Sequence, residues 1–109
     1  MANPINIVYP AGTSGPQVAQ ALDWTVAPFS ASAALFIVSG AASYAIEVCF
    51  DTEDAIAAGL DRWFETSLGQ WQTASAFTSI SSPVTFVRVN FNGGTTGQCE
   101  LKLVQGLPV

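Results

Sequence analysis

The sequence contains no histidine and few charged residues. Without histidine, catalytic dyads and triads with an imidazole base are excluded, as are zinc sites that use histidine ligands. Charged residues make up 10% of the 109 residues, against roughly 25% in an ordinary soluble domain, while half of the chain is hydrophobic. That balance excludes an intrinsically disordered chain. The length fits one domain, residues 1–109, with enough chain to bury a hydrophobic core.

Basic residues are scarce, since Arg62, Arg88 and Lys102 are the only ones in a chain of net charge −5. Binding to a phosphate backbone needs a basic face, so we expect no nucleic-acid partner. Six of the eight acids lie in residues 1–61, which contain no base: Asp23, Glu47, Asp51, Glu53, Asp54 and Asp61. This uneven charge favours a positively charged neighbour for the first part of the chain.

Long apolar runs and targeting signals are also missing. The longest apolar run, residues 33–38, is too short to span a bilayer, so we expect no membrane partner. A secretory signal needs a basic start, and no base precedes Arg62, so we expect synthesis in the cytoplasm. Cys49 lies on the less apolar side of its alternating strand, whereas Cys99 lies on the apolar side of its own. Since the two sulfur atoms then face different environments, we expect two free thiols and no disulfide.

Strand patterns dominate what the chain does contain. Period-two alternation of apolar residues runs through residues 5–9, 22–26 and 44–50, and it places Trp24 in the core. Residues 33–39 form a continuous apolar run, as expected of a fully buried strand. Residues 84–92 and 97–104 flank the turn sequence Asn92-Gly93-Gly94, which predicts a β-hairpin in which Arg88 pairs with Glu100.

One short helix is expected in the middle of the chain. Residues 51–54 are rich in capping side chains and precede an alanine-rich stretch that Gly59 ends, although a long hairpin loop fits the same residues. The predicted fold is therefore an all-β, antiparallel sandwich or barrel-like single domain with at most one short helix. Weakly patterned, proline-containing residues 1–20 and residues 105–109 are expected to be extended terminal arms.

The sequence contains few residues that could form a catalytic site or a metal site. Asp51, Glu53, Asp54 and Asp61 are the only carboxylate cluster, and no convergent set of polar groups accompanies them, so we expect no enzyme. Calcium is the alternative ligand for these acids, but the stretch lacks the glycine and glutamate spacing of an EF-hand loop. A helix cap explains the same residue types, so we expect no metal and no cofactor.

The sparse charge suggests that other chains cover much of the surface, because few charged side chains are left to solubilise the domain. Large aromatic residues serve as interface anchors. The candidates for capsid or subunit contacts are Tyr9, Trp63, Phe64 and Trp71, with the acids Glu53, Asp54 and Asp61. Stacking of a sugar on Trp63 and Trp71 is the alternative role for the two indoles.

Residues 44–106 resemble small virion proteins of tailed bacteriophages. The shared order is an alternating strand with an acidic end (44–51), the pair Trp63-Phe64, a Pro-Val-Thr-Phe-Val-Arg-Val-Asn strand (83–90) and a last strand ending in Val104-Gln105-Gly106. Proteins of this pattern look like head decoration, or cement, proteins. The resemblance covers a little over half of the chain and consists of structural residues.

The resemblance implies a β-rich protein on the exterior of a capsid, acting as a homotrimer that binds the major capsid protein and clamps adjacent capsomers. It carries over no catalytic residue. Another phage component, from the tail or its tip, and a small carbohydrate-binding module remain the alternatives.

Overall fold

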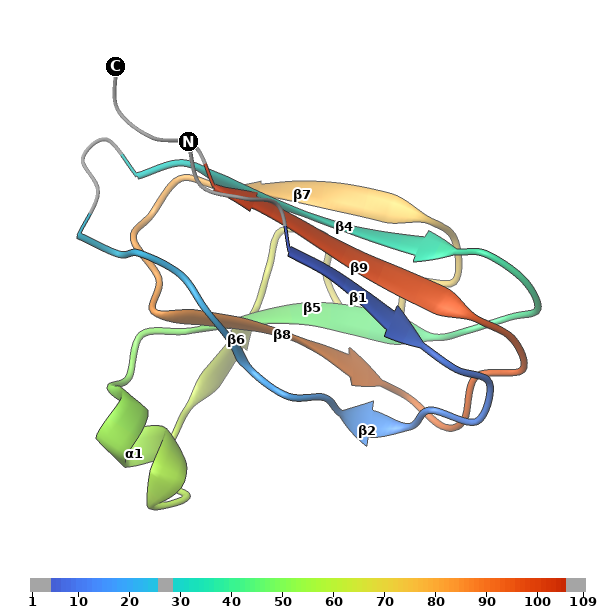
Figure 1. Cartoon of the computed structure of the whole chain (residues 1–109), viewed down its shortest axis with the longest axis horizontal. Helices are drawn as coiled ribbons and strands as arrows, with labels where there is room; N and C mark the ends of the chain where they lie inside the picture. The colour runs from blue at the N-terminus through green and yellow to red at the C-terminus, as the bar shows by residue number, and fades with distance from the viewer. Residues whose placement is uncertain (1–4, 26–28, 106–109) are drawn as a thin grey trace.

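Two antiparallel β-sheets pack face to face as a sandwich, and one short helix lies at one end (Figure 1). The computed structural model describes residues 5–25 and 29–105. Sheet A has the strand order β1-β9-β4-β7, and sheet B has the order β2-β8-β5-β6 with β3 also paired to β8. The predicted all-β sandwich with one short helix is confirmed, and over the described residues the sheets do not close into a barrel.

The strands of sheet A are β1 (Ile5–Tyr9), β4 (Ala31–Ile37), β7 (Ala76–Ile80) and β9 (Cys99–Gln105). Those of sheet B are β2 (Gly15–Pro16), β3 (Gln20–Ala21), β5 (Tyr44–Cys49), β6 (Trp63–Glu65) and β8 (Phe86–Phe91). The helix α1 (Glu53–Ala57) lies between β5 and β6.

The core lies between the sheets and is built from alternate strand residues. Leu35 on β4 pairs with Leu101 on β9, and Ile46 on β5 pairs with Val89 on β8, so large apolar side chains face each other across neighbouring strands. All four of these residues are fully buried. Burial of this kind is the main favourable term in folding and fixes the register, because a slip of one residue would turn each strand's apolar side outward.

The predicted helix is confirmed, together with its cap. The hydroxyl of Thr52 accepts a hydrogen bond from the backbone N–H of Ala55 at 3.2 Å, and Glu53 and Asp54 lie in the first turn, where the helix dipole favours acids. Gly59, at φ +75°, follows the helix in a conformation that favours glycine.

The predicted hairpin of residues 84–104 is wrong, because its two strands belong to different sheets. β8 pairs with β5 in sheet B, whereas β9 lies between β1 and β4 in sheet A. Seven residues, 92–98, connect them, which is enough chain to cross between sheets about 10 Å apart. The turn sequence Asn92-Gly93-Gly94 therefore begins a crossover between sheets.

The predicted strand of residues 22–26 is also wrong over the part that the structure describes. Pairing with β8 ends at Ala21, and the Asp23 carboxylate then accepts hydrogen bonds from the backbone N–H of Thr25 at 3.1 Å and from its hydroxyl at 2.6 Å. Such a local turn competes with strand pairing. Trp24 is consequently 56% exposed instead of lying in the core, and Val26 lies outside the described residues.

The segment expected to be an N-terminal arm is paired to the sandwich where it is described. Residues 5–9 form β1 against β9, and residues 15–16 form β2 against β8. Gln105, expected to start a C-terminal tail, is the last residue of β9. Residues 1–4 and 106–109 lie outside the described residues.

Three connections between the sheets meet at one end of the sandwich, which we call the loop junction: residues 10–14, 38–43 and 92–98 (Figure 1). Gly12 N–H donates to the Thr95 carbonyl at 2.7 Å, and Thr95 N–H donates to the Thr13 carbonyl at 3.0 Å. Thr96 joins the third connection, since its N–H donates to the Ala41 carbonyl at 3.0 Å. The backbone groups of three crossovers thereby satisfy one another.

Gly97 lets two of these connections touch. A Cβ atom placed on Gly97 would overlap the backbone carbonyl group of Ser39, whereas one on Gly94 would make ordinary contact with Gly12 at 3.9 Å. Neither glycine has a positive φ, so the left-handed conformation that favours glycine is required at neither position.

We therefore expect Gly97→Ala to lower the free energy of unfolding by about 3 kcal/mol, because backbone atoms of Ser39 would have to move. The matched variant Gly94→Ala should change it by less than about 0.5 kcal/mol. Urea denaturation of both variants measures the difference. Equal stability of the two would contradict the close packing of the loop junction.

Candidate functional site

Arg88 is the centre of a polar cluster on the outer face of sheet B. Its Nε donates to Glu47 Oε1 at 2.8 Å, and its guanidinium carbon lies 4.1 Å from the centroid of the Trp63 ring. The Trp63 indole N–H in turn donates to the Asp61 carboxylate. The predicted pair of Arg88 with Glu100 is wrong, because Glu100 lies on β9 in sheet A while Glu47 is directly opposite Arg88 on β5.

This cluster covers the outer side of β5, where the alternation predicted exposure. Ala45 and Cys49 are fully buried, and Glu47 is 8% exposed. Cys49 on β5 and Cys99 on β9 are free thiols, as predicted, but both are buried, whereas the alternation placed only Cys99 on the buried side. Burial raises the pKa of Cys99. Arg88 thus pairs with Glu47 and covers the Trp63 ring, while Glu65, exposed on β6 opposite Glu47, adds a second carboxylate to this face.

Trp63 and Trp71 do not share one stacking platform. Trp63 is paired with Cys49 at one end of β5, while Gln72, next to Trp71, bridges to Tyr44 at the other end. Because a strand rises about 3.3 Å per residue, these ends are roughly 16 Å apart. A single sugar ring cannot stack on both indoles.

The other aromatic candidates lie in two different environments. Tyr9 is 6% exposed and packs edge-on against Phe91, with ring centroids 5.3 Å apart, so it belongs to the core and not to an exposed interface. Phe64 is 56% exposed and rests against Phe50, with centroids 5.9 Å apart. Of the predicted aromatic anchors, Phe64 therefore presents the most open ring.

The predicted acids occupy the region of α1. Glu53 and Asp54 are exposed on the helix, whereas Asp61 is engaged by Trp63. Asp51 accepts hydrogen bonds from the Arg62 backbone N–H at 2.7 Å and from its guanidinium at 3.2 Å, and these contacts lower the pKa of Asp51. Within residues 5–25 and 29–105, no three potential metal-ligating side chains come together.

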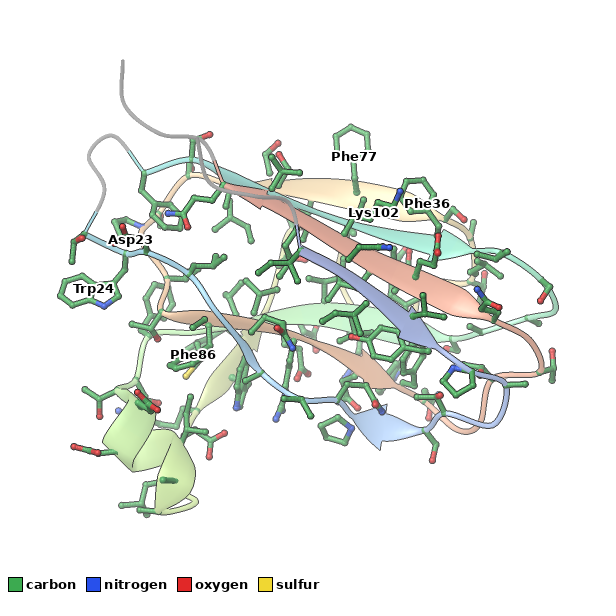
Figure 2. The ribbon with its side chains drawn as sticks, viewed as in Figure 1. Asp23, Trp24, Phe36, Phe77, Phe86 and Lys102 are labelled. Atoms are coloured by element: carbon green, nitrogen blue, oxygen red, sulfur yellow. The ribbon has the colours of Figure 1, made fainter. Side chains whose placement is uncertain are left out.

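The outer face of sheet A carries an apolar patch that the sequence did not predict (Figure 2). We define the sheet A patch by four exposed apolar residues and two charged ones: Val8, Phe36, Phe77, Val104, Glu100 and Lys102. Phe77 is 70% exposed, the most open ring in the described part of the chain. The patch spans all four strands of the sheet.

Strand register brings these side chains onto one face, together with the exposed polar residues Asn6, Ser32 and Ser79. Val8, Glu100 and Phe36 lie in one row across β1, β9 and β4, and Lys102 and Phe77 both pair with Ala34 in the next row. The Lys102 ammonium nitrogen is 5.6 Å from the Phe36 ring centroid. At standard strand spacing the whole face, apolar and polar residues together, covers roughly 400 Å².

Two features of the sequence conceal this patch. Residues 33–39 are apolar at almost every position, so the run predicted burial on both sides, yet Phe36 and Val38 face solvent. Phe77 lies in a stretch rich in serine and threonine that gave no clear strand pattern. Ala33 and Leu35 alternate with Ala34 and Phe36, so the two pairs face opposite sides of the strand. Because all four residues are apolar, the sequence does not indicate which side faces the other sheet.

Comparisons of the chain with protein-family models, with curated proteins and with solved structures gave no match. The described part of the chain has no helix of the length and apolarity needed to cross a bilayer.

The two buried tyrosines differ in the hydrogen bonding of their hydroxyl groups. The Tyr44 hydroxyl donates to the Ala74 carbonyl at 2.7 Å, whereas the buried Tyr9 hydroxyl has no hydrogen-bond partner among the described residues. Tyr44→Phe should lower the free energy of unfolding by about 1 kcal/mol, and Tyr9→Phe should leave it unchanged or raise it. Urea denaturation at neutral pH measures both; an equal loss for the two variants would contradict the assignment.

Tyr9 also predicts a loss of stability in alkali. Burial raises the pKa of Tyr9 to about 12, from 10.0 for the ordinary phenol. Between these values the unfolded chain releases the proton first, so the stability present below pH 10 falls as pH rises toward 12. Tyr9→Phe should flatten this fall in a series of urea titrations from pH 9 to about pH 12. An unchanged slope would contradict it.

Proposed function

We propose that this chain is a structural protein of a bacteriophage virion that binds the outside of the head shell through the sheet A patch. The observation that carries the proposal is the exposure of Val8, Phe36, Phe77 and Val104 on one face of sheet A, where Glu100 and Lys102 are the only charged side chains among the described residues. The sequence resemblance of residues 44–106 to head decoration proteins supports the same role. In this role the protein has the major capsid protein as its partner and performs no catalysis.

The size of the patch favours binding in several copies. One partner of a stable protein complex contributes about 800 Å², roughly twice what the sheet A patch offers. A single contact of this kind is weak, but linked copies bind with a high effective concentration. The proposal therefore includes a homotrimer, whose closed symmetry would also cover sheet edges such as those of β1 and β7.

The acids on α1 would meet a different neighbour from the patch. α1 lies beside sheet B, away from sheet A (Figure 1). If Glu53 and Asp54 contact a basic area of an adjacent subunit, as their charge favours, binding to the shell weakens when both are neutralised and becomes less sensitive to salt. Unchanged binding would restrict the contact to sheet A.

The patch is tested by replacing its two rings. Phe36→Ser combined with Phe77→Ser should weaken binding to undecorated, empty head shells by at least about tenfold, because exposed aromatic residues dominate interface energies. Both rings are exposed, so the fold should persist. Co-sedimentation with shells, at increasing protein concentration, measures the change.

Val18→Ser is the matched control, since Val18 is 78% exposed but lies between β2 and β3, outside the sheet A patch. Light scattering across a dilution series gives the mass of each variant in solution and shows whether trimers form. Full binding by the double variant would refute the sheet A contact, and binding of the native protein to tails but not to shells would refute the head location.

A further inference from the structure

A pocket of about 510 Å³ lies where the end of β5 and the start of α1 meet the segments around β3 and β8. Its apolar walls include Trp24, Phe50, Pro83 and Phe86, and its polar side includes Asp51 and Glu53. The volume is typical of ligand sites, which are mostly apolar with a few polar groups. Figure 2 shows Trp24 and Phe86 at the α1 end of the sandwich, far from Phe36 and Phe77.

The charge of this pocket is negative, and no lysine or arginine lines it. Asp51 is already paired with Arg62 on its other side. The Glu53 carboxylate, by contrast, has no hydrogen bond or ion pair within the part of the chain that the structure describes. Trp24 and Phe50 are 56% and 54% exposed, so two aromatic surfaces stand open beside a carboxylate.

An intramolecular contact in this protein already joins a guanidinium to an aromatic ring and a carboxylate. On sheet B, a guanidinium lies over the Trp63 ring at 4.1 Å while it pairs with Glu47 at 2.8 Å. The pocket offers the same two groups, an indole and a carboxylate, but none of the described residues that line it is a cation. Arginine suits this pair better than lysine because its guanidinium is planar and weakly hydrated, and so stacks on aromatic faces.

We propose that this pocket binds an arginine side chain presented by a short apolar segment of a partner protein. The guanidinium stacks on Trp24 and pairs with Glu53, and a flanking apolar residue fills the part of the pocket lined by Phe50 and Phe86. Because the pocket lies away from the sheet A patch, this proposal does not depend on the sheet A contact with the head shell. It shares Glu53 with the proposed α1 contact, but binding of a short peptide is measured without shells and so can fail or hold by itself.

The test uses the full chain and two capped tripeptides, acetyl-Leu-Arg-Leu-amide and the same peptide with citrulline, the neutral analogue of arginine. Titration to about 10 mM, followed by the NMR signal of the Trp24 indole N–H, covers the millimolar range expected of a single side-chain contact. We expect saturable shifts at Trp24 with the arginine peptide, and at least about threefold weaker binding of the citrulline peptide.

Variants separate the two contacts. Glu53→Gln should weaken binding about threefold, whereas Asp54→Asn, on the same helix but outside the pocket, should change it less than twofold. Trp24→Ala should weaken it about fivefold, with binding followed at backbone amides of residues 50–53. Equal binding of both peptides, equal effects of the two helix variants, or no saturable shift at 10 mM would each overturn the proposal.

Discussion

The loop junction is the constraint on which the rest of this fold depends. Hydrogen bonds from Gly12 to Thr95 and from Thr96 to Ala41 hold three crossovers together, and each crossover passes from one sheet to the other. One of these crossovers, residues 92–98, carries the chain from β8 in sheet B to β9 in sheet A. β9 can then lie between β1 and β4, which brings Val8, Phe36 and Lys102 into one surface. The sheet A patch is thus a product of connectivity as much as of composition.

Each of the three basic side chains makes an intramolecular contact. Arg62 pairs with Asp51, Arg88 pairs with Glu47, and Lys102 lies over the Phe36 ring. All three bases therefore have an intramolecular partner, while acids such as Glu53 and Asp54 on α1 point to solvent. A partner that recognises this protein by charge must bring the positive charge itself.

The sequence predicts where strands and the helix lie better than it predicts which strands pair with each other. Period-two alternation located β1, β5 and β9, and capping residues located α1, because these signals are local. The hairpin of residues 84–104 failed since nothing local tells a tight turn from a crossover, and Trp24 was misplaced because the Asp23 turn overrode the apolar pattern. Of the site candidates, Phe64 is exposed and Tyr9 is buried. Phe77 was missed because the serine- and threonine-rich stretch around it shows no clear strand pattern.

The position of β9 also has a consequence for folding order. This strand, the last in the described chain, lies between β1, the first, and β4, and Leu103 is opposite Ile5. β4 and β7 can pair as the chain leaves the ribosome, but β1, which pairs with β9, cannot join sheet A until β9 has been synthesised. Contacts that span nearly the whole sequence slow folding. Until residues 99–105 emerge, the apolar inner sides of β1 and β4 lack their shared neighbour, so the nascent chain passes through an interval in which it is prone to aggregate.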